Sequence, residues 1–191
     1  MLETQSHPTL SAAMQYPSER DESHPVPMTR DAFFYYFAYG SCMCPVDLKR
    51  SLGESTHAYV LGPAVLHGYR LGFFRRSRLR NCGVLDVVPD ASASVEGVLY
   101  RLPMHLSDRL DEREEGYQQA TVAIHQGDRI YPHVRTYSVI EKLTEEHAPN
   151  DWYFNVVLRG AVTCGLSEQY CWRLFHHMHH LQQSQVTLRS A

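Results

Sequence analysis

The hydrophobic residues of this chain gather after residue 30 and follow two periodicities. An uninterrupted aromatic run from Phe33 to Ala38 is typical of a strand that is buried on both faces. Further strand-like runs, rich in Val, Tyr, Leu and Ile and separated by Gly, Pro, Asp or Ser, occupy 57–61, 64–74, 83–88, 95–102, 120–125 and 131–140. This spacing predicts a mainly antiparallel sheet or a small β-barrel.

Other segments have the apolar spacing of helices. They are residues 45–52, 106–115, 152–161 and 167–183. We expect Ser107 to cap the second helix and Gly116 to end it, because these residue types favour the two helix ends. Near the chain end, Trp172 and Leu174 are interpreted as core residues. The fold class predicted is therefore α+β, a single domain at 31–183 with helices flanking a curved sheet or barrel.

The two ends of the chain differ from this domain in composition. Residues 1–30 contain Ser, Pro, Glu, His and Arg with no regular apolar spacing, which predicts a disordered N-terminal tail. Residues 184–191 are expected to form a flexible C-terminus.

Composition and charge narrow the class of function. The chain has 191 residues and a formal net charge of −3, so neither nucleic acid nor an anionic membrane is the expected partner. It has no apolar run of about 18 residues and no signal-peptide pattern at its start. An odd number of scattered cysteines indicates reduced thiols and a cytoplasmic location. These are Cys42, Cys44, Cys82, Cys164 and Cys171.

Two short segments carry candidate chemistry. Tyr39-Gly40-Ser41-Cys42-Met43 directly follows the first strand, where glycine allows close approach of a ligand and successive N–H groups can bind an anion. The second segment, residues 110–117, places four acids near the C-terminal end of a predicted helix, which is the negative end of the helix dipole and disfavours acids. A structural turn and a solvated acidic face are the alternatives for the two segments.

Taken together, the motifs resemble those of γ-glutamylcyclotransferases, including the AIG2-like and ChaC-like branches. Phe37-Ala38-Tyr39-Gly40-Ser41 resembles the family's Y-G-S loop, and residues 95–100 resemble its V-x-G-V-x-Y strand. Leu110-Asp111-Glu112-Arg113-Glu114 resembles the L-D-x-x-E motif, and residues 113–117 resemble R-E-x-G-G-Y. Residues 66–71 and 151–153 add weaker matches, so the likeness covers roughly 34–175. Cys42 and Glu115 depart from the pattern, which usually has Asn or Leu and Gly at these positions.

The resemblance implies a cofactor-independent enzyme that converts a γ-glutamyl amide into 5-oxoproline and a free amine. Its small-molecule substrate would be a γ-glutamyl amino acid, a γ-glutamyl amine or glutathione. The resemblance assigns the role of proton acceptor and donor to Glu114, with Glu115 as the second candidate. It assigns substrate binding to Tyr39, Gly40, Ser41, Cys42, Met43, Tyr117 and Tyr153, with no metal site. A non-catalytic binding module that keeps the pocket, and an enzyme that cleaves γ-glutamyl groups from bulkier amines, are the alternatives.

Three other clusters of residues could carry chemistry. The histidines at 176, 177, 179 and 180 have metal-ligand spacing on a helix, but a solvated or packed helix face is favoured. Cys42-x-Cys44 is interpreted as two reduced thiols, with Cys42 as a nucleophile the weaker alternative. The basic run 75–80 predicts a solvated hairpin tip that can also attract an anionic substrate.

Overall fold

The computed structural model describes residues 32–190, which form one α+β domain around a closed barrel, as the sequence predicts. The expected tail at 1–30 falls outside this range. The strands are β1 (Phe33–Ala38), β2 (Val60–Ser77), β3 (Cys82–Pro103), β4 (Tyr117–Gln126) and β5 (Arg129–Val139). The α-helices are α1 (Pro45–Leu52), α2 (Ser107–Arg113), α3 (Asp151–Thr163) and α4 (Glu168–Ser190). Short 3₁₀ helices are η1 (Ser41–Met43), η2 (His57–Tyr59) and η3 (Met104–Leu106).

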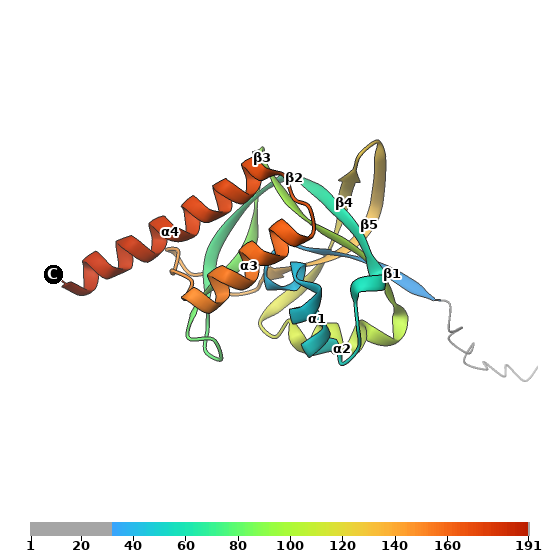
Figure 1. Ribbon diagram of the computed structural model, residues 1–191, viewed down its shortest axis with the longest axis horizontal. Helices are drawn as coiled ribbons and strands as arrows, with labels where there is room; N and C mark the ends of the chain where they lie inside the picture. The colour runs from blue at the N-terminus through green and yellow to red at the C-terminus, as the bar shows by residue number, and fades with distance from the viewer. Residues whose placement is uncertain (1–31, 191) are drawn as a thin grey trace, which may run out of the picture.

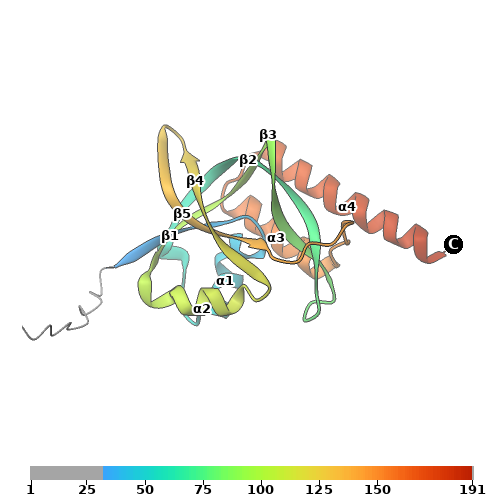
Figure 2. The same cartoon turned by 180° about the vertical axis from the view of Figure 1, so that it is seen from behind.

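The barrel has the strand order β1-β3-β2-β4-β5 (Figure 1). Strands β1 and β5 run parallel and close the barrel where Tyr36 pairs with Arg135, whereas the other neighbours are antiparallel. Helices α1 and α2 lie side by side below one end of the barrel, and α3 and α4 pack together on its flank (Figure 2). The loop that leaves β1 therefore lies between the barrel and three of the helices.

Strands β2 and β3 are longer than the hydrophobic pattern suggests. The predicted run 64–74 lies within β2, and 83–88 and 95–102 both lie within β3. Irregularities in the β2–β3 register, at Val60/Gly62, His67/Tyr69 and Gly72/Arg75, allow the strands to continue through glycines. The glycine and proline positions that we expected to end strands thus bend them, and the β2–β3 hairpin reaches beyond the barrel (Figure 2).

Two strand predictions need correction. Phe33 is 39% exposed, so β1 is buried only in its second half, because its first residues extend past the barrel to pair with the end of β3 (Figure 1). Residues 57–61 were expected to be a strand, but His57–Tyr59 forms η2. There the Thr56 hydroxyl donates to Pro45 O, and the Thr56 carbonyl accepts from Tyr59 N, which turns the chain before β2.

The helices also differ in detail from the expectations. Ser107 makes no capping bond; its hydroxyl accepts from Arg135 Nη1 at 2.8 Å instead. Leu174 is buried as expected, but Trp172 is 54% exposed because it lies on the outer face of α4 and stacks on His176. Helix α4 continues through Ser190 and so includes residues 184–190, the segment for which we predict a flexible C-terminus.

Helix α3 fixes the loop after β1 from outside. A Cβ added at Gly160 would lie 2.8 Å from Cys44 N and 3.0 Å from Met43 C, so the backbones of α3 and the loop are in direct contact. From the other side, Tyr100 Oη in β3 donates to the carbonyls of Cys42 at 3.2 Å and Met43 at 3.0 Å. The loop is consequently held in one conformation by the sheet and by α3.

Candidate active site

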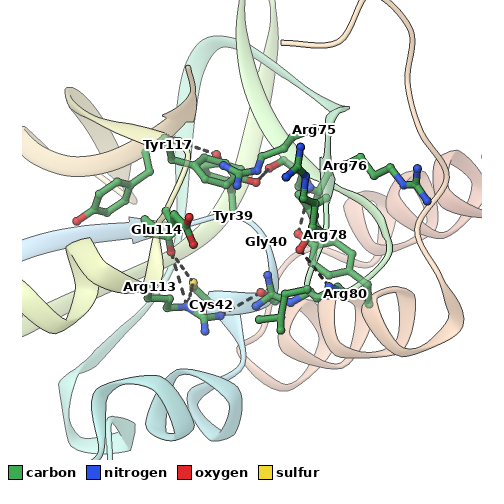
Figure 3. A pocket seen from close by; sticks show the side chains of 18 of the residues that line it. Tyr39, Gly40, Cys42, Arg75, Arg76, Arg78, Arg80, Arg113, Glu114 and Tyr117 are labelled. Atoms are coloured by element: carbon green, nitrogen blue, oxygen red, sulfur yellow. Dashed lines mark hydrogen bonds and ion pairs between the residues drawn. The ribbon is translucent and has the colours of Figure 1, made fainter. Parts of the chain in front are cut away.

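A cavity of about 350 Å³ opens beside this loop. Most of its lining comes from the loop after β1, the tip of the β2–β3 hairpin, and the turn between α2 and β4 (Figure 3), with one tyrosine each from β5 and α3. The cavity is lined by Tyr36, Tyr39, Gly40, Ser41, Cys42, Arg75, Arg76, Ser77, Arg78, Leu79, Arg80, Val84, Leu85, Arg113, Glu114, Glu115, Tyr117, Tyr137 and Tyr153. The structure therefore brings together most of the residues that the sequence motifs singled out.

Glu114 enters this cavity from the end of α2. Its backbone N–H donates to Leu110 O at 3.2 Å and to Asp111 O at 3.1 Å, which closes the last turn of the helix. Gly116 then takes a φ of +80°, a conformation that glycine adopts without steric cost, and the chain turns into β4. This turn leaves the Glu114 side chain only 13% exposed and directed at the loop after β1 (Figure 3).

The surroundings of Glu114 change its acidity. Burial raises the pKa of its carboxyl, while the positive charge of Arg113 and a hydrogen bond from Cys42 oppose that rise without cancelling it. Cys42 Sγ donates to Glu114 Oε1 at 3.1 Å, and Arg113 Nε lies 3.7 Å from the same oxygen. A carboxylate with a raised pKa is suited to accept a proton and later return it near neutral pH.

Arg113 is a central residue of the site that sequence reasoning missed. Its side chain is 8% exposed and its Nη2 contacts Asp47 Oδ2 at 2.9 Å and Ser41 Oγ at 3.1 Å. Its Nε donates to Cys42 Sγ at 2.9 Å, and its Nη1 donates to Ser51 Oγ. One guanidinium thus ties α2, the loop after β1 and α1 together around the catalytic candidate. Arg113 is the first residue of the R-E-x-G-G-Y resemblance, but that motif does not predict its contacts with Asp47 and Ser41.

The loop after β1 lines the cavity with four of its five predicted residues. A Cβ at Gly40 would lie 3.1 Å from Tyr153 Oη, so glycine allows the loop to approach that hydroxyl closely. Tyr39 Oη donates to Tyr137 O at 2.6 Å. Met43 does not line the cavity: its side chain is fully buried, and its N–H donates to Gly40 O at 3.0 Å. The expectation that Met43 contacts substrate directly is therefore not supported by its position.

Cys42 is placed beside Glu114 but is poorly suited to act as a nucleophile. Burial raises the pKa of its thiol to about 12, against the opposing charge of Arg113. The reactive form of cysteine is the thiolate, so a thiol that stays protonated at neutral pH is a weak nucleophile. In this site Cys42 instead acts as a hydrogen-bond donor to the Glu114 carboxylate.

Tyr117 and Tyr153 form another wall of the cavity. Tyr117 Oη donates to Leu85 O at 2.8 Å, and Tyr153 Oη accepts from Leu85 N at 3.1 Å. Both hydroxyls thus pair with the backbone of one residue of β3. The two residues line the cavity, and their hydroxyls fix the side chains to strand β3. Tyr36, a further lining residue, was read from the sequence only as part of a buried strand.

Glu115 and Glu114 occupy different environments. Glu115 borders the cavity but is exposed, whereas Glu114 is mostly buried and bonded to Cys42. Of the two acids that the sequence left as candidates, the geometry favours Glu114.

The histidine cluster of α4 lies away from these residues and makes ordinary packing contacts. His177 Nε2 contacts Glu146 Oε1 at 3.0 Å, His176 stacks on Trp172, and His179 stacks on Phe175. Across residues 32–190 we find no group of three His, Cys, Asp or Glu side chains placed to hold a metal ion. Over the same range, no helix has the length and apolar composition needed to cross a membrane.

Comparison with known proteins finds similarity to one family. Residues 94–174 match the model of the AIG2-like family. The chain is 33% identical over 151 residues to the Bacillus subtilis (strain 168) protein named "Putative gamma-glutamylcyclotransferase YkqA". The resemblance to γ-glutamylcyclotransferases is confirmed. The match covers 77% of this chain and 53% of YkqA, so the chain spans about half the length of that relative.

Solved structures of the γ-glutamylcyclotransferase family share the fold. The crystal structure of YkqA superimposes with a TM-score of 0.70, covering 77% of this chain and 54% of YkqA. A structure described as γ-glutamyl cyclotransferase gives a TM-score of 0.68 at 22% identity, covering 75% of this chain and 86% of that one. A glutathione-specific γ-glutamyl cyclotransferase from yeast gives 0.56 at 14% identity, covering 79% and 97%. The latter two support the fold alone.

Proposed function

We propose that this chain cyclises γ-glutamyl amides, releasing 5-oxoproline and a free amine, with Glu114 as the proton acceptor and donor. The observation that carries the proposal is one mostly buried carboxylate with a raised pKa, held beside the Tyr39–Cys42 loop in a cavity of about 350 Å³. The fold shared with YkqA and with a structure described as γ-glutamyl cyclotransferase supports the proposal.

The reaction places simple demands on the protein. The α-amino group of the γ-glutamyl unit attacks its own γ-carbonyl, closing a five-membered lactam, and the C–N bond to the amine breaks. Because the nucleophile is part of the substrate, holding the folded conformer supplies much of the rate enhancement. The α-ammonium group must lose two protons to become the lactam N–H. Glu114 accepts the first before attack and passes it to solvent; it accepts the second as the new C–N bond forms and gives it to the leaving nitrogen. These reaction steps need no cofactor.

The other residues would bind and orient the substrate. Ser41 and Cys42 line the cavity, and their N–H groups lie at the start of η1, where a helix has no acceptor of its own for them. They are the proposed donors to the oxyanion or to the α-carboxylate. Arg75 lies with its guanidinium 5.0 Å from the Tyr117 ring and close enough to Glu114 to affect its charge. Tyr117 and Tyr153 would enclose the glutamyl chain.

An assay for 5-oxoproline tests the proposal directly. Incubating the protein with γ-glutamyl-alanine, a γ-glutamyl amine and glutathione should release 5-oxoproline from at least one of them. If none is turned over while the same compounds bind, the chain is a binding module that keeps the family's pocket. Release from bulky γ-glutamyl amines alone would identify the enzyme as one that acts on larger amines.

The pH dependence should report the acidity of Glu114. Because the base must be ionised, kcat/KM should fall as pH drops through its pKa, and burial places this fall at a higher pH than for an ordinary glutamate. Arg75 lowers the pKa of Glu114, so Arg75→Gln should move the acid limb of the kcat/KM profile to higher pH. The exposed Arg129, which stacks on Tyr131 outside the cavity, provides the control variant Arg129→Gln. A limb that stays in place or moves to lower pH would argue against Glu114 as the base.

A further inference from the structure

The tip of the β2–β3 hairpin gives the cavity an unusual charge. Arg75, Arg76, Arg78 and Arg80 all line it. Arg75 lies over the Tyr117 ring, and Arg78 and Arg80 lie across the cavity from Glu114 (Figure 3). Among the described residues, none of the four forms an ion pair with a carboxylate. Glu114 and Glu115 are the acids in the cavity lining, so positive charge is in excess there.

This hairpin tip is a fixed wall of the cavity. Asn150 Nδ2, from the N-cap of α3, donates to Arg80 O at 2.9 Å, and Arg80 N donates to Ser77 Oγ at 3.2 Å. The Arg80 guanidinium lies 5.6 Å from the Trp152 ring centre and 6.0 Å from that of Tyr153. These contacts join the tip to the helix that also supports the loop after β1. The sequence-based expectation of a solvated tip holds for Arg76, Arg78 and Leu79, which are exposed, whereas Arg75 and Arg80 are half-buried.

The four arginines differ in their contacts and in their exposure to solvent. Arg76 donates to Asn81 Oδ1 at 2.7 Å within the hairpin. Arg75 and Arg80 both lower the pKa of Glu114, which places their charges near the proposed reaction centre. Arg78 is exposed, borders the cavity and forms no hydrogen bond with another described residue through its side chain. A bound substrate can therefore contact the guanidiniums of Arg75 and Arg80 near Glu114, and that of Arg78 at the exposed border of the cavity.

We infer that the hairpin arginines select γ-glutamyl amides whose amine part carries carboxylates, with Arg78 and Arg80 as the specificity-determining residues. This inference rests on the proposed function and refines it. The γ-glutamyl unit is a zwitterion that needs one anion-binding group, and Arg75 beside Glu114 can supply it. The remaining guanidiniums suit carboxylates on the leaving group, because arginine binds them through paired, charge-assisted hydrogen bonds.

Three substrates with the same scissile amide separate the charge effect from the chemistry. At neutral pH, γ-glutamyl-ethylamide has no net charge, γ-glutamyl-alanine has one negative charge and γ-glutamyl-glutamate has two. We expect kcat/KM to rise along this order, by about tenfold or more from first to last, the size of one charge-assisted hydrogen bond. Added salt should reduce the difference, because the cavity mouth is open to solvent.

Substitution of the arginines assigns the effect to them. Arg78→Gln and Arg80→Gln should each lower the ratio of kcat/KM for γ-glutamyl-glutamate to that for γ-glutamyl-ethylamide by about fivefold to tenfold. Arg129→Gln should leave the ratio unchanged. Using a ratio removes any effect of Arg80 on the acidity of Glu114, because all the substrates share that base.

The outcomes distinguish this inference from the proposed function. Equal kcat/KM for the three substrates would overturn the inference, as would an unchanged substrate ratio in both Arg78→Gln and Arg80→Gln. In either case, release of 5-oxoproline from the neutral substrate would still support the proposed function. Release of no 5-oxoproline from any substrate would overturn both.

Discussion

Glu114→Gln is expected to lower 5-oxoproline formation by about a thousandfold or more. Glutamine has nearly the same size and keeps a hydrogen-bond acceptor for Cys42, but it cannot take the proton of the α-ammonium group. General acid–base catalysis typically contributes ~10²–10⁴-fold, and here one group would serve both steps. The measurement is kcat/KM by product analysis, with whichever γ-glutamyl amide the wild-type protein turns over.

Glu115→Gln is the matched control for this experiment. The two glutamates are adjacent in the chain, but Glu115 is exposed and Glu114 is mostly buried. We expect Glu115→Gln to stay within about threefold of wild type, as surface substitutions usually have small effects. If Glu115→Gln is inactive and Glu114→Gln retains activity, the catalytic role passes to Glu115 and the mechanism proposed for Glu114 is wrong.

The Glu114→Gln variant should be more stable than the wild-type protein at neutral pH. The pKa of Glu114 is higher in the folded protein than its ordinary value, so its ionised form is disfavoured by folding. Stability contributed by such a group is present at low pH and lost as pH rises through the folded-state pKa. Denaturant unfolding should therefore show the advantage of Glu114→Gln at pH 7.5 and its decline toward pH 4. A loss of stability at pH 7.5 would contradict the burial argument.

The motifs predicted the parts of the site that lie close together in sequence. The Tyr39–Cys42 loop follows a strand, and Glu114 ends a helix just before Gly116, so local chemistry was enough to single them out. Their meeting across the cavity depended on the family resemblance. The strand pattern likewise predicted a barrel, but it divided β3 at a proline and small polar residues that the real strand passes through.

The residues that the sequence missed act through distant contacts. Arg113 pairs with Asp47, 66 positions earlier, and only the packing of α1 against α2 makes that pair possible. The arginines of the hairpin were recognised as basic, but their place over the cavity follows from the length of β2 and β3 and from Asn150 at the start of α3. Periodicity reports which face of an element is buried and gives no measure of such distances.

Arg113→Met is expected to lower the free energy of unfolding by about 3–5 kcal/mol. The Asp47 side chain is 7% exposed, and Arg113 is the cation that it contacts. Removing the guanidinium leaves a buried carboxylate without its counter-charge, which costs far more than the pair itself contributes. The hydroxyl of Ser41 and the thiol of Cys42 lose their donor at the same time. Urea unfolding followed by circular dichroism measures the change.

The partner variant and a neighbouring arginine make the result specific. Asp47→Asn in the Arg113→Met background removes the unpaired charge, so it should recover part of the lost stability, and it provides a folded protein if the single variant does not fold. Arg50→Met, on the exposed face of the same helix α1, should change stability by less than about 0.5 kcal/mol. A cost below about 1 kcal/mol for Arg113→Met, or no recovery in the double variant, would show that this ion pair does not hold the three elements together. In that case Glu114 would owe its position to the helix end and Cys42 alone.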